Sequence, residues 1–398
     1  MNMNTDISLF LEGAEVVDVD THLSEAPDLW LSRAPAKYRA RVPQLKDVNG
    51  RPSWFIDGDR SLGLDYPVST ILKDGTVTSG SSFMSLRHED VHPASYGGHA
   101  RVELMDTQGV WAQIIYPNIL GFSGKKSMEV DPEIRLVTTQ IYNDAMAEMQ
   151  SESGDRLLPV AVLPWWDIEE SIEEARRVAK LGLRGVSINP DPHPHGVPDL
   201  GNAAWDPFWE ACAAESLPVS FHIGLSDSSF TMFTDAAWPS LNADQNMLVG
   251  GANVFLGNVS TLTNIIISGV LERHPELRVV SVESGLGWIP FILNALDYQM
   301  NNAGPGASNR LKMLPSEYFR RQCYATFWFE GEHLADFVRM LGADNCMFET
   351  DFPHPVCLYP NPVEKIRPAL ERLPKQDQIK VMSTNAMTLY RIPSRPRN

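Results

Sequence analysis

The chain has 398 residues and a formal net charge of −17, with 43% hydrophobic residues. This length allows two ordinary domains or one large α/β barrel with insertions. The acidic charge argues against nucleic acid or an anionic membrane as a partner, because both are themselves negatively charged.

Compartment and redox state can be predicted from three absences in the sequence. The amino terminus has no basic segment followed by an apolar run, and no apolar run approaches the length of a bilayer span. The four cysteines show no Cys-x-x-Cys spacing, which favours reduced thiols. These features predict a cytoplasmic protein with no membrane partner.

Short apolar segments recur along the chain, and helical patterns such as Pro132–Ser151 and Thr261–Arg273 lie between them. Continuously apolar strands alternating with helices are typical of a parallel sheet covered on both faces. Eight such units predict one closed (β/α)8 barrel over residues 1–398. An open doubly wound sheet is the alternative, but no Gly-x-Gly-x-x-Gly follows the first segment. The predicted strands are Glu15–His22, Val110–Pro117, Leu157–Pro164, Gly185–Pro190, Pro218–Gly224, Leu277–Gly285, Cys323–Phe329 and Cys346–His354.

Two long segments interrupt the alternation and are predicted to be insertions after the first and fifth strands. Residues 30–108 form the first, a cap within the barrel, and their Asn49-Gly50 and Asp57-Gly58 dipeptides predict a small β-sheet. Residues 225–256 form the second and show little periodicity. Long loops at this end of a barrel shape the substrate pocket. The aromatic and Met residues between Phe230 and Phe255 suggest a bulky, apolar small-molecule substrate.

Polar side chains gather where the predicted strands end, and these ends share one rim of a barrel. A lone buried histidine or carboxylate is more often a structural residue, but four strands supplying such groups together favour a metal site. Imidazole and carboxylate ligands suit a divalent transition metal such as Zn, Fe or Mn, as one ion or two. The candidate ligands are Asp20, His22 and Glu25 from the first strand, and His222, Glu283 and Asp351 from later strands.

Two further histidines are candidates for supporting roles. His354 follows Asp351 closely and is predicted to orient the site from behind the ligands. His92 lies in the first long segment and is a candidate for contact with the substrate.

The chain resembles the amidohydrolase-related family that includes aminocarboxymuconate semialdehyde decarboxylase. The resemblance implies a metal-dependent barrel, often dimeric, with hydrolytic or non-oxidative decarboxylating chemistry. It assigns Asp20, His22, His222 and Asp351 to site positions. Besides the metal motifs, the matching segments are Leu104–Val110, Ile115–Pro117, Ser268–Pro275, Pro315–Phe319 and Thr350–His354.

Two departures from the family pattern bear on the chemistry. The decarboxylase has His-x-His on the first strand, where this chain has Asp20-Thr21-His22. It also has a proton-transferring His on the sixth strand, where this chain has Glu283. The extra carboxylates make a two-ion site conceivable and favour hydrolysis over decarboxylation.

The sequence therefore predicts a metal-dependent hydrolase that uses a metal-activated water on an ester, thioester, amide or activated carbon–carbon bond. Asp351 would orient that water and move its proton, and Glu283 would be a ligand or general acid. One alternative is non-oxidative decarboxylation of an aromatic or unsaturated acid. The other is an inactive barrel that acts as a binding protein. A homodimer is expected from the resemblance.

Overall fold

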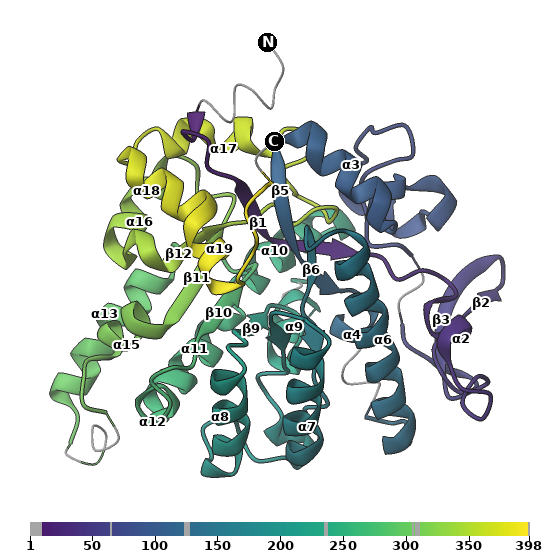
Figure 1. The fold of residues 1–398 in the computed structure, drawn as a ribbon, viewed down its shortest axis with the longest axis horizontal. Coiled ribbons are helices and arrows are strands. Elements are labelled where there is room, and N and C mark those ends of the chain that lie inside the picture. The colour runs from purple at the N-terminus through teal and green to yellow at the C-terminus, as the bar shows by residue number, and fades with distance from the viewer. Residues whose placement is uncertain are drawn as a thin grey trace.

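The computed structural model describes residues 10–63, 66–122, 128–234, 238–304, 306 and 311–396. Its described part contains the eight predicted strands arranged as a parallel barrel with helices outside (Figure 1). The barrel strands are β1 (Val16–Leu23), β5 (Val110–Pro117), β6 (Leu157–Pro159) with β7 (Ala161–Val162), β8 (Val186–Ser187), β9 (Val219–His222), β10 (Val279–Val282), β11 (Cys323–Phe327) and β12 (Cys346–Phe348).

The two strand groups join into one ring at two places, at the third predicted strand and between the first and last strands. Residue Val160 separates β6 from β7, so the third predicted strand pairs with β5 through its first half and with β8 through its second. After β12, the backbone amide of His22 in β1 donates to the carbonyl of Phe352 at 2.7 Å. Thr21 and Phe352 form a parallel bridge there. The (β/α)8 prediction is confirmed.

Most connecting segments are helical, and the helices surround the strands (Figure 1). They are α2 (Leu29–Arg33), α3 (Gly98–Gln108), α4 (Ile119–Phe122), α6 (Pro132–Glu152), α7 (Ile168–Lys180), α8 (Asp206–Ala214), α9 (Asp227–Thr234), α10 (Ala243–Val254), α11 (Asn258–Ile267), α12 (Val270–Arg273), α13 (Ile289–Asn302), α15 (Pro315–Gln322), α16 (Leu334–Leu341), α17 (Pro362–Leu370), α18 (Lys375–Ile379) and α19 (Asn385–Leu389). The predicted helix Thr261–Arg273 is divided into α11 and α12, because Gly269 has a left-handed backbone with φ of 80°.

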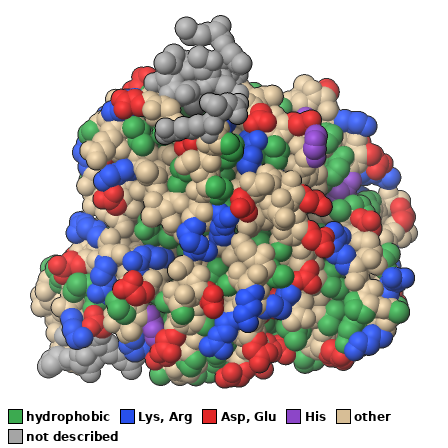
Figure 2. Space-filling model, in the orientation of Figure 1, with side chains coloured by type: hydrophobic (Ala, Val, Ile, Leu, Met, Phe, Trp, Pro, Cys, Tyr) green, Lys and Arg blue, Asp and Glu red, His purple; other side chains and the backbone are tan. Residues whose placement is uncertain are grey.

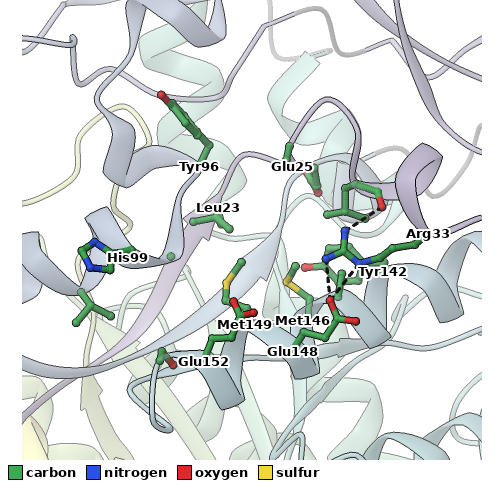
Figure 3. A pocket seen from close by; sticks show the side chains of 16 residues that line it. Leu23, Glu25, Arg33, Tyr96, His99, Tyr142, Met146, Glu148, Met149 and Glu152 are labelled. Atoms are coloured by element: carbon green, nitrogen blue, oxygen red, sulfur yellow. Dashed lines mark hydrogen bonds and ion pairs between the residues drawn. The ribbon is translucent and has the colours of Figure 1, made fainter.

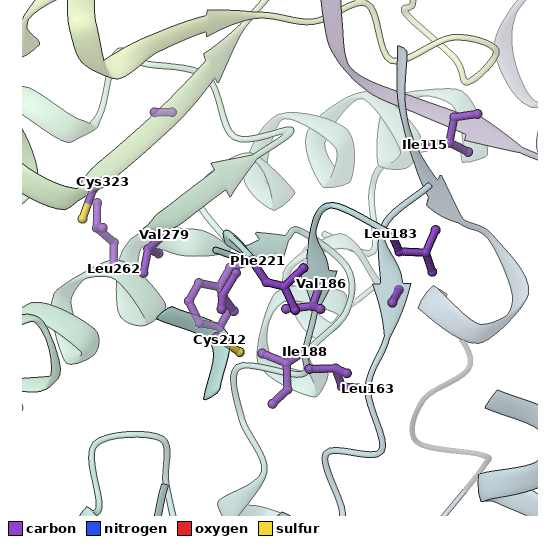
Figure 4. Close-up of a cluster of buried hydrophobic side chains, with 14 of the residues drawn as sticks. Ile115, Leu163, Leu183, Val186, Ile188, Cys212, Phe221, Leu262, Val279 and Cys323 are labelled. Carbon is purple, nitrogen blue, oxygen red and sulfur yellow. The ribbon is translucent and has the colours of Figure 1, made fainter. Parts of the chain in front are cut away.

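Alternate side chains of the strands enter two different apolar layers. Val279 of β10 joins the layer between sheet and helices, together with Phe221 of β9 and Leu262 of α11 (Figure 4). Val280 and Val282 belong instead to a second cluster, which residues of the C-terminal segment such as Tyr390 complete. Buried apolar side chains therefore hold the strands on both faces and fix the strand ends relative to one another.

The segment between β1 and β5 carries the predicted small antiparallel sheet. It consists of β2 (Gln44–Val48), β3 (Arg51–Ile56) and β4 (Arg60–Ser61). Asn49 and Gly50 connect the first two strands with φ of 55° and 82°, the left-handed geometry that a two-residue hairpin loop requires. The segment after β9 is helical in α9 and α10. Only Gly250 of α10 is buried among its described residues, so the helix lacks an apolar face and gave no periodic signal.

The surface is charged (Figure 2), and the described helices are not those of a membrane-spanning protein segment. On the face in Figure 2, acidic and basic side chains are interspersed. Among the described residues, no helix combines the length and apolar character needed to cross a bilayer. The four cysteines are free.

A buried arginine ties the end of β1 to its neighbours. Arg101 of α3 is fully buried, and its guanidinium donates to the carbonyls of His22 at 2.5 Å and Ala94 at 2.6 Å. It also donates to Gln113, whose amide donates to Asp18 in β1. This network fixes the backbone of His22 from behind.

We expect Arg101→Met to lower the free energy of unfolding by about 3–5 kcal/mol. The substitution leaves the buried carbonyls of His22 and Ala94 without a hydrogen-bond donor and Asp18 without the nearby positive charge. Urea unfolding measures this change. Arg339→Met is the control, since Arg339 pairs with Asp336 at the surface and should cost under about 1 kcal/mol. A loss for Arg101→Met no larger than that of the control would contradict the prediction.

Candidate metal centre

Six predicted site residues converge at the carboxyl ends of the strands. Asp20 and His22 come from the end of β1, His222 from the last position of β9, and Glu283 from the position after β10. Asp351 and its neighbour His354 follow β12. All but Glu283, which is half-buried, are at most 4% exposed. The barrel thus brings distant parts of the chain into one enclosed cluster.

The first part of the cluster contains Asp20, His22, His222 and Glu283, which can each offer a ligand atom within 4.8 Å of the others. The Nε2 atoms of His22 and His222 are 3.1 Å apart. The Asp20 Oδ1 atom lies 3.6 Å and 3.5 Å from these two nitrogens. The Oε2 atom of Glu283 lies 3.3 Å from Nε2 of His222. Two imidazole nitrogens and two carboxylates therefore face one point.

The second part joins the first through His22. Asp351 Oδ1 is 3.8 Å from His22 Nε2 and 3.0 Å from His354 Nδ1. The rings of His22 and His354 stack with centroids 3.8 Å apart. The other nitrogen of His354, Nε2, lies 2.8 Å from Oδ1 of Asn118. Asp351 and His354 thus form a pair at the side of the four-residue group.

Burial dominates the electrostatics of the carboxyl groups. Desolvation raises the pKa of Asp20 and raises that of Asp351 well above its ordinary value. It also raises the pKa of Glu283 to about 8. Neighbouring carboxylates add to the rise for Asp351 and Glu283, since like charges repel. So many buried acids in one place favour either protonation or a cation.

The pKa values of the histidines shift in two directions. Burial lowers the pKa of His22 and of His354 well below the ordinary value. For His222, desolvation is the largest influence and lowers the pKa, but the carboxylates of Asp20 and Glu283 outweigh it and raise the pKa to about 9. Neutral imidazoles are the form that binds metal.

The donor set fits a divalent metal ion. Neither carboxylate oxygen of Asp20 accepts a well-formed hydrogen bond from the described residues, although both are buried. A buried carboxylate without donors is costly unless a cation balances it. Mixed imidazole and carboxylate ligands on a rigid rim suit Zn, Mn or Fe.

The backbone at two residues of the cluster is strained in the same way. Glu283 has φ of 53° and Asp351 has φ of 58°. This left-handed region is unfavourable for residues other than glycine, and such residues cluster at functional sites. Both strands are shorter than the sequence predicts: β10 ends directly before Glu283, and β12 ends three residues before Asp351.

Two predicted residues lie outside the cluster. Glu25 is buried, and its Oε1 accepts hydrogen bonds from the backbone amides of Asn118 and Ile119 at 3.0 and 2.8 Å. The chain leaves the strand after Leu23, so the side chain of Glu25 does not join those of Asp20 and His22. His92 begins a short 3-10 helix and accepts from the amide of Ala94 at 3.2 Å.

Two residues of the site were not predicted. Asn118 holds His354, and Glu349 is a fully buried carboxylate whose Oε2 accepts from the backbone amide of Glu283 at 3.3 Å. Both are polar residues directly after apolar strands, the signal that identified the other ligands. Applied without exception, that rule would have found them.

We expect metal affinity to fall by at least roughly tenfold for each pH unit below about 8. The raised pKa of Glu283 keeps its carboxyl protonated below that value, so the ion must displace a proton, and lowering the pH favours the metal-free form. Competition with a chromophoric chelator between pH 6 and 9 measures this dependence. Glu283→Gln should make the dependence shallower without abolishing it, because His222, whose pKa is raised to about 9, must still lose its proton to bind the ion. An affinity independent of pH in the unmodified protein would contradict the assignment.

Comparison with known proteins identifies the family. The Amidohydrolase family matches residues 17–392. Gamma-resorcylate decarboxylase of Rhodococcus jostii is 25% identical over 325 residues, covering 75% of this chain and 92% of that relative. The 2-amino-3-carboxymuconate-6-semialdehyde decarboxylase of Dictyostelium discoideum is 22% identical over 346 residues, covering 85% of this chain and 82% of its own.

Solved structures share the fold. An amidohydrolase of Mycobacterium avium subsp. paratuberculosis superposes with a TM-score of 0.74 at 24% identity, covering 95% of this chain and 98% of its own. A dihydroxybenzoic acid decarboxylase of Polaromonas sp. superposes with a TM-score of 0.60 at 19% identity, covering 95% and 97%. That protein was solved with bound manganese and the inhibitor 2-nitroresorcinol.

These relatives correct one prediction. Hydrolysis was inferred from the carboxylate at Glu283, but both curated relatives are decarboxylases, so hydrolysis as the main activity is wrong. In the structure Glu283 belongs to the same four-residue group as His222, so a carboxylate at this position does not by itself indicate a hydrolytic two-ion site. The barrel, its cluster of candidate metal ligands and the match over residues 17–392 lead to one conclusion: the chain belongs to the Amidohydrolase family.

Proposed function

We propose that this protein is a metal-dependent, non-oxidative decarboxylase of a small aromatic or unsaturated carboxylic acid. The observation that carries the proposal is the four-residue group of Asp20, His22, His222 and Glu283 with a carboxyl–imidazole pair beside it. Decarboxylation needs these two parts, a charge that holds the acid and a proton donor. The decarboxylase relatives support the same reaction.

Asp20, His22, His222 and Glu283 would hold one divalent ion, because their ligand atoms lie within reach of a single point. A bound ion supplies positive charge that binds the acid substrate and stabilises negative charge developing on it. Manganese in the Polaromonas enzyme makes that metal the first to test, with zinc and iron as the others. These four side chains are buried or half-buried, so the ion would be shielded from bulk water.

The Asp351–His354 pair is arranged to hold a proton. Because Nε2 of His354 faces the amide oxygen of Asn118, that nitrogen carries the hydrogen and donates it. Nδ1 is then the lone-pair nitrogen facing Oδ1 of Asp351 at 3.0 Å, so a proton shared between these two atoms would belong to Asp351. The raised pKa of Asp351 and the lowered pKa of His354 agree with this placement of the proton.

In the reaction, the carboxyl proton of Asp351 would pass to the substrate carbon that bears the carboxylate. The bond from that carbon to the carboxylate then breaks, its electron pair stays with the carbon, and carbon dioxide leaves. Asp351 becomes a carboxylate and regains a proton from water. No oxidant or reductant is required.

The test is carbon dioxide release from carboxyl-labelled acids, including 2,6-dihydroxybenzoate and unsaturated dicarboxylic acids, by protein loaded with manganese or zinc. We expect release from at least one class, its loss after treatment with a chelator, and its recovery when the metal is returned. Consumption of an ester or amide by the same preparation, with no carbon dioxide from any acid, would overturn the proposal.

A further inference from the structure

A cavity of about 390 Å³ lies outside the metal cluster, between the end of β1 and helices α2, α3 and α6 (Figure 3). Leu29 of α2 and Val102 of α3 line it, together with Met146 and Met149 of α6. Methionine side chains adapt to differently shaped apolar groups, which suits a wall that accepts a ligand. The cavity is large enough for a small organic molecule.

A buried carboxylate faces this apolar cavity. Glu25 lines it, yet the residue is only 3% exposed. Its Oε1 is held by the backbone amides of Asn118 and Ile119, whereas its Oε2 has no hydrogen-bond partner among the described residues. A buried carboxylate oxygen without a donor is unfavourable, and a ligand that brings a donor would relieve that cost.

The other charges around the cavity favour a cation. Glu148 and Glu152 of α6 also line it, and the guanidinium of Arg33 forms an ion pair with Glu148 at 2.7 Å. The lining therefore carries more acidic than basic groups. The rings of Tyr96 and Tyr142 add aromatic faces, which attract organic cations.

We propose that this cavity is a second small-molecule site, specific for an organic ammonium compound with an aromatic or branched apolar body. Its ammonium group donates to Oε2 of Glu25, and its body lies against Met146 and Met149. Burial raises the pKa of Glu25 to about 7, which agrees with an acid that lacks its cation. The site is separate from the metal cluster but shares the Asn118 loop with it.

The full-length, metal-loaded protein with ¹³C-labelled methionine methyl groups provides the test. Phenethylammonium is the probe, with 2-phenylethanol and 3-phenylpropanoate as its neutral and anionic counterparts. We expect phenethylammonium to shift the Met146 and Met149 signals saturably, with the neutral and anionic compounds at least about tenfold weaker. Substitution of each methionine by leucine assigns the signals. The readout does not involve activity, so it is independent of the proposed decarboxylation.

Two charge-matched variants locate the cation. Glu25→Gln keeps an oxygen for the Asn118 and Ile119 amides but replaces the acceptor facing the cavity, so it should weaken binding at least about tenfold. Glu148→Gln removes the same charge from a side chain that is 56% exposed, so it should change affinity by less than about threefold.

A third variant covers the case in which Glu25→Gln does not fold. Val102→Phe fills the cavity and leaves Glu25 in place, so it should abolish the shifts of both methionines. The proposal is overturned if phenethylammonium shifts neither signal, if the alcohol binds equally well, or if binding survives both Glu25→Gln and Val102→Phe.

Discussion

Asp351→Asn should lower turnover by about 10²–10⁴-fold while the protein still binds its metal. Asparagine keeps the size of the side chain, and its amide can still face His354 across the 3.0 Å contact. It has no proton to give at neutral pH, so the step that places a proton on the substrate carbon loses its donor. Steady-state carbon dioxide release and metal content on the same preparation measure both properties.

A second aspartate–histidine pair provides the control. Asp206, at the start of α8, lies 2.9 Å from Nε2 of His274, which follows α12, and neither belongs to the metal cluster. Asp206→Asn makes the same chemical change and should leave turnover within about twofold of the wild-type value. Turnover of Asp351→Asn within tenfold of wild type would remove Asp351 from the role of proton donor.

His222→Ala should abolish stoichiometric metal binding and, with it, turnover. His222 is central to the four-residue group, with Nε2 3.1 Å from that of His22 and 3.3 Å from Glu283. Losing an outer residue of a metal site already costs about 10–100-fold in affinity, so losing a direct ligand should cost more than about 100-fold. Elemental analysis after dialysis, with activity measured alongside, tests this expectation.

His274→Ala is the matched control, because it also removes a nearly buried histidine. It should lower stability without changing metal content. Equal metal content in His222→Ala and wild type would show that the ion is bound outside the four-residue group. Excess manganese that restores full turnover to His222→Ala would also contradict the assignment of His222 as a ligand.

Much of the fold follows from the sequence because barrel strands are buried on both faces. Every residue of β1 and β5 is buried, and each strand opens on apolar residues, so each stands out in the sequence as a largely apolar segment. Helix α10 was missed for the opposite reason, since it buries only Gly250 among its described residues and shows no apolar periodicity. Periodicity reports burial, and an exposed helix gives little of it.

Sequence predicts those site residues whose positions are determined by the ends of the barrel strands. Asp20, His22, His222, Glu283 and Asp351 follow strands whose ends meet on one rim, and the structure brings them together. How the chain turns after leaving a strand is not determined by that rule. Glu25, only three residues beyond His22, therefore faces a different cavity.

The reaction was the part that sequence reasoning misjudged. Carboxylate in place of imidazole at Glu283 was interpreted as a sign of hydrolysis, yet the curated relatives are decarboxylases. Both reactions use a metal ion and an acid group, so ligand type alone does not separate them. The arrangement of Asp351, His354 and Asn118, on which the proposed proton donor rests, becomes visible only in the structure.

The most direct test of the account is carbon dioxide release measured against metal added to stripped protein. We predict that release is absent without metal, rises linearly as manganese or zinc is added, and reaches a plateau at about one equivalent per chain. Full release from the stripped protein, or none from protein holding one equivalent in the four-residue group, would contradict it.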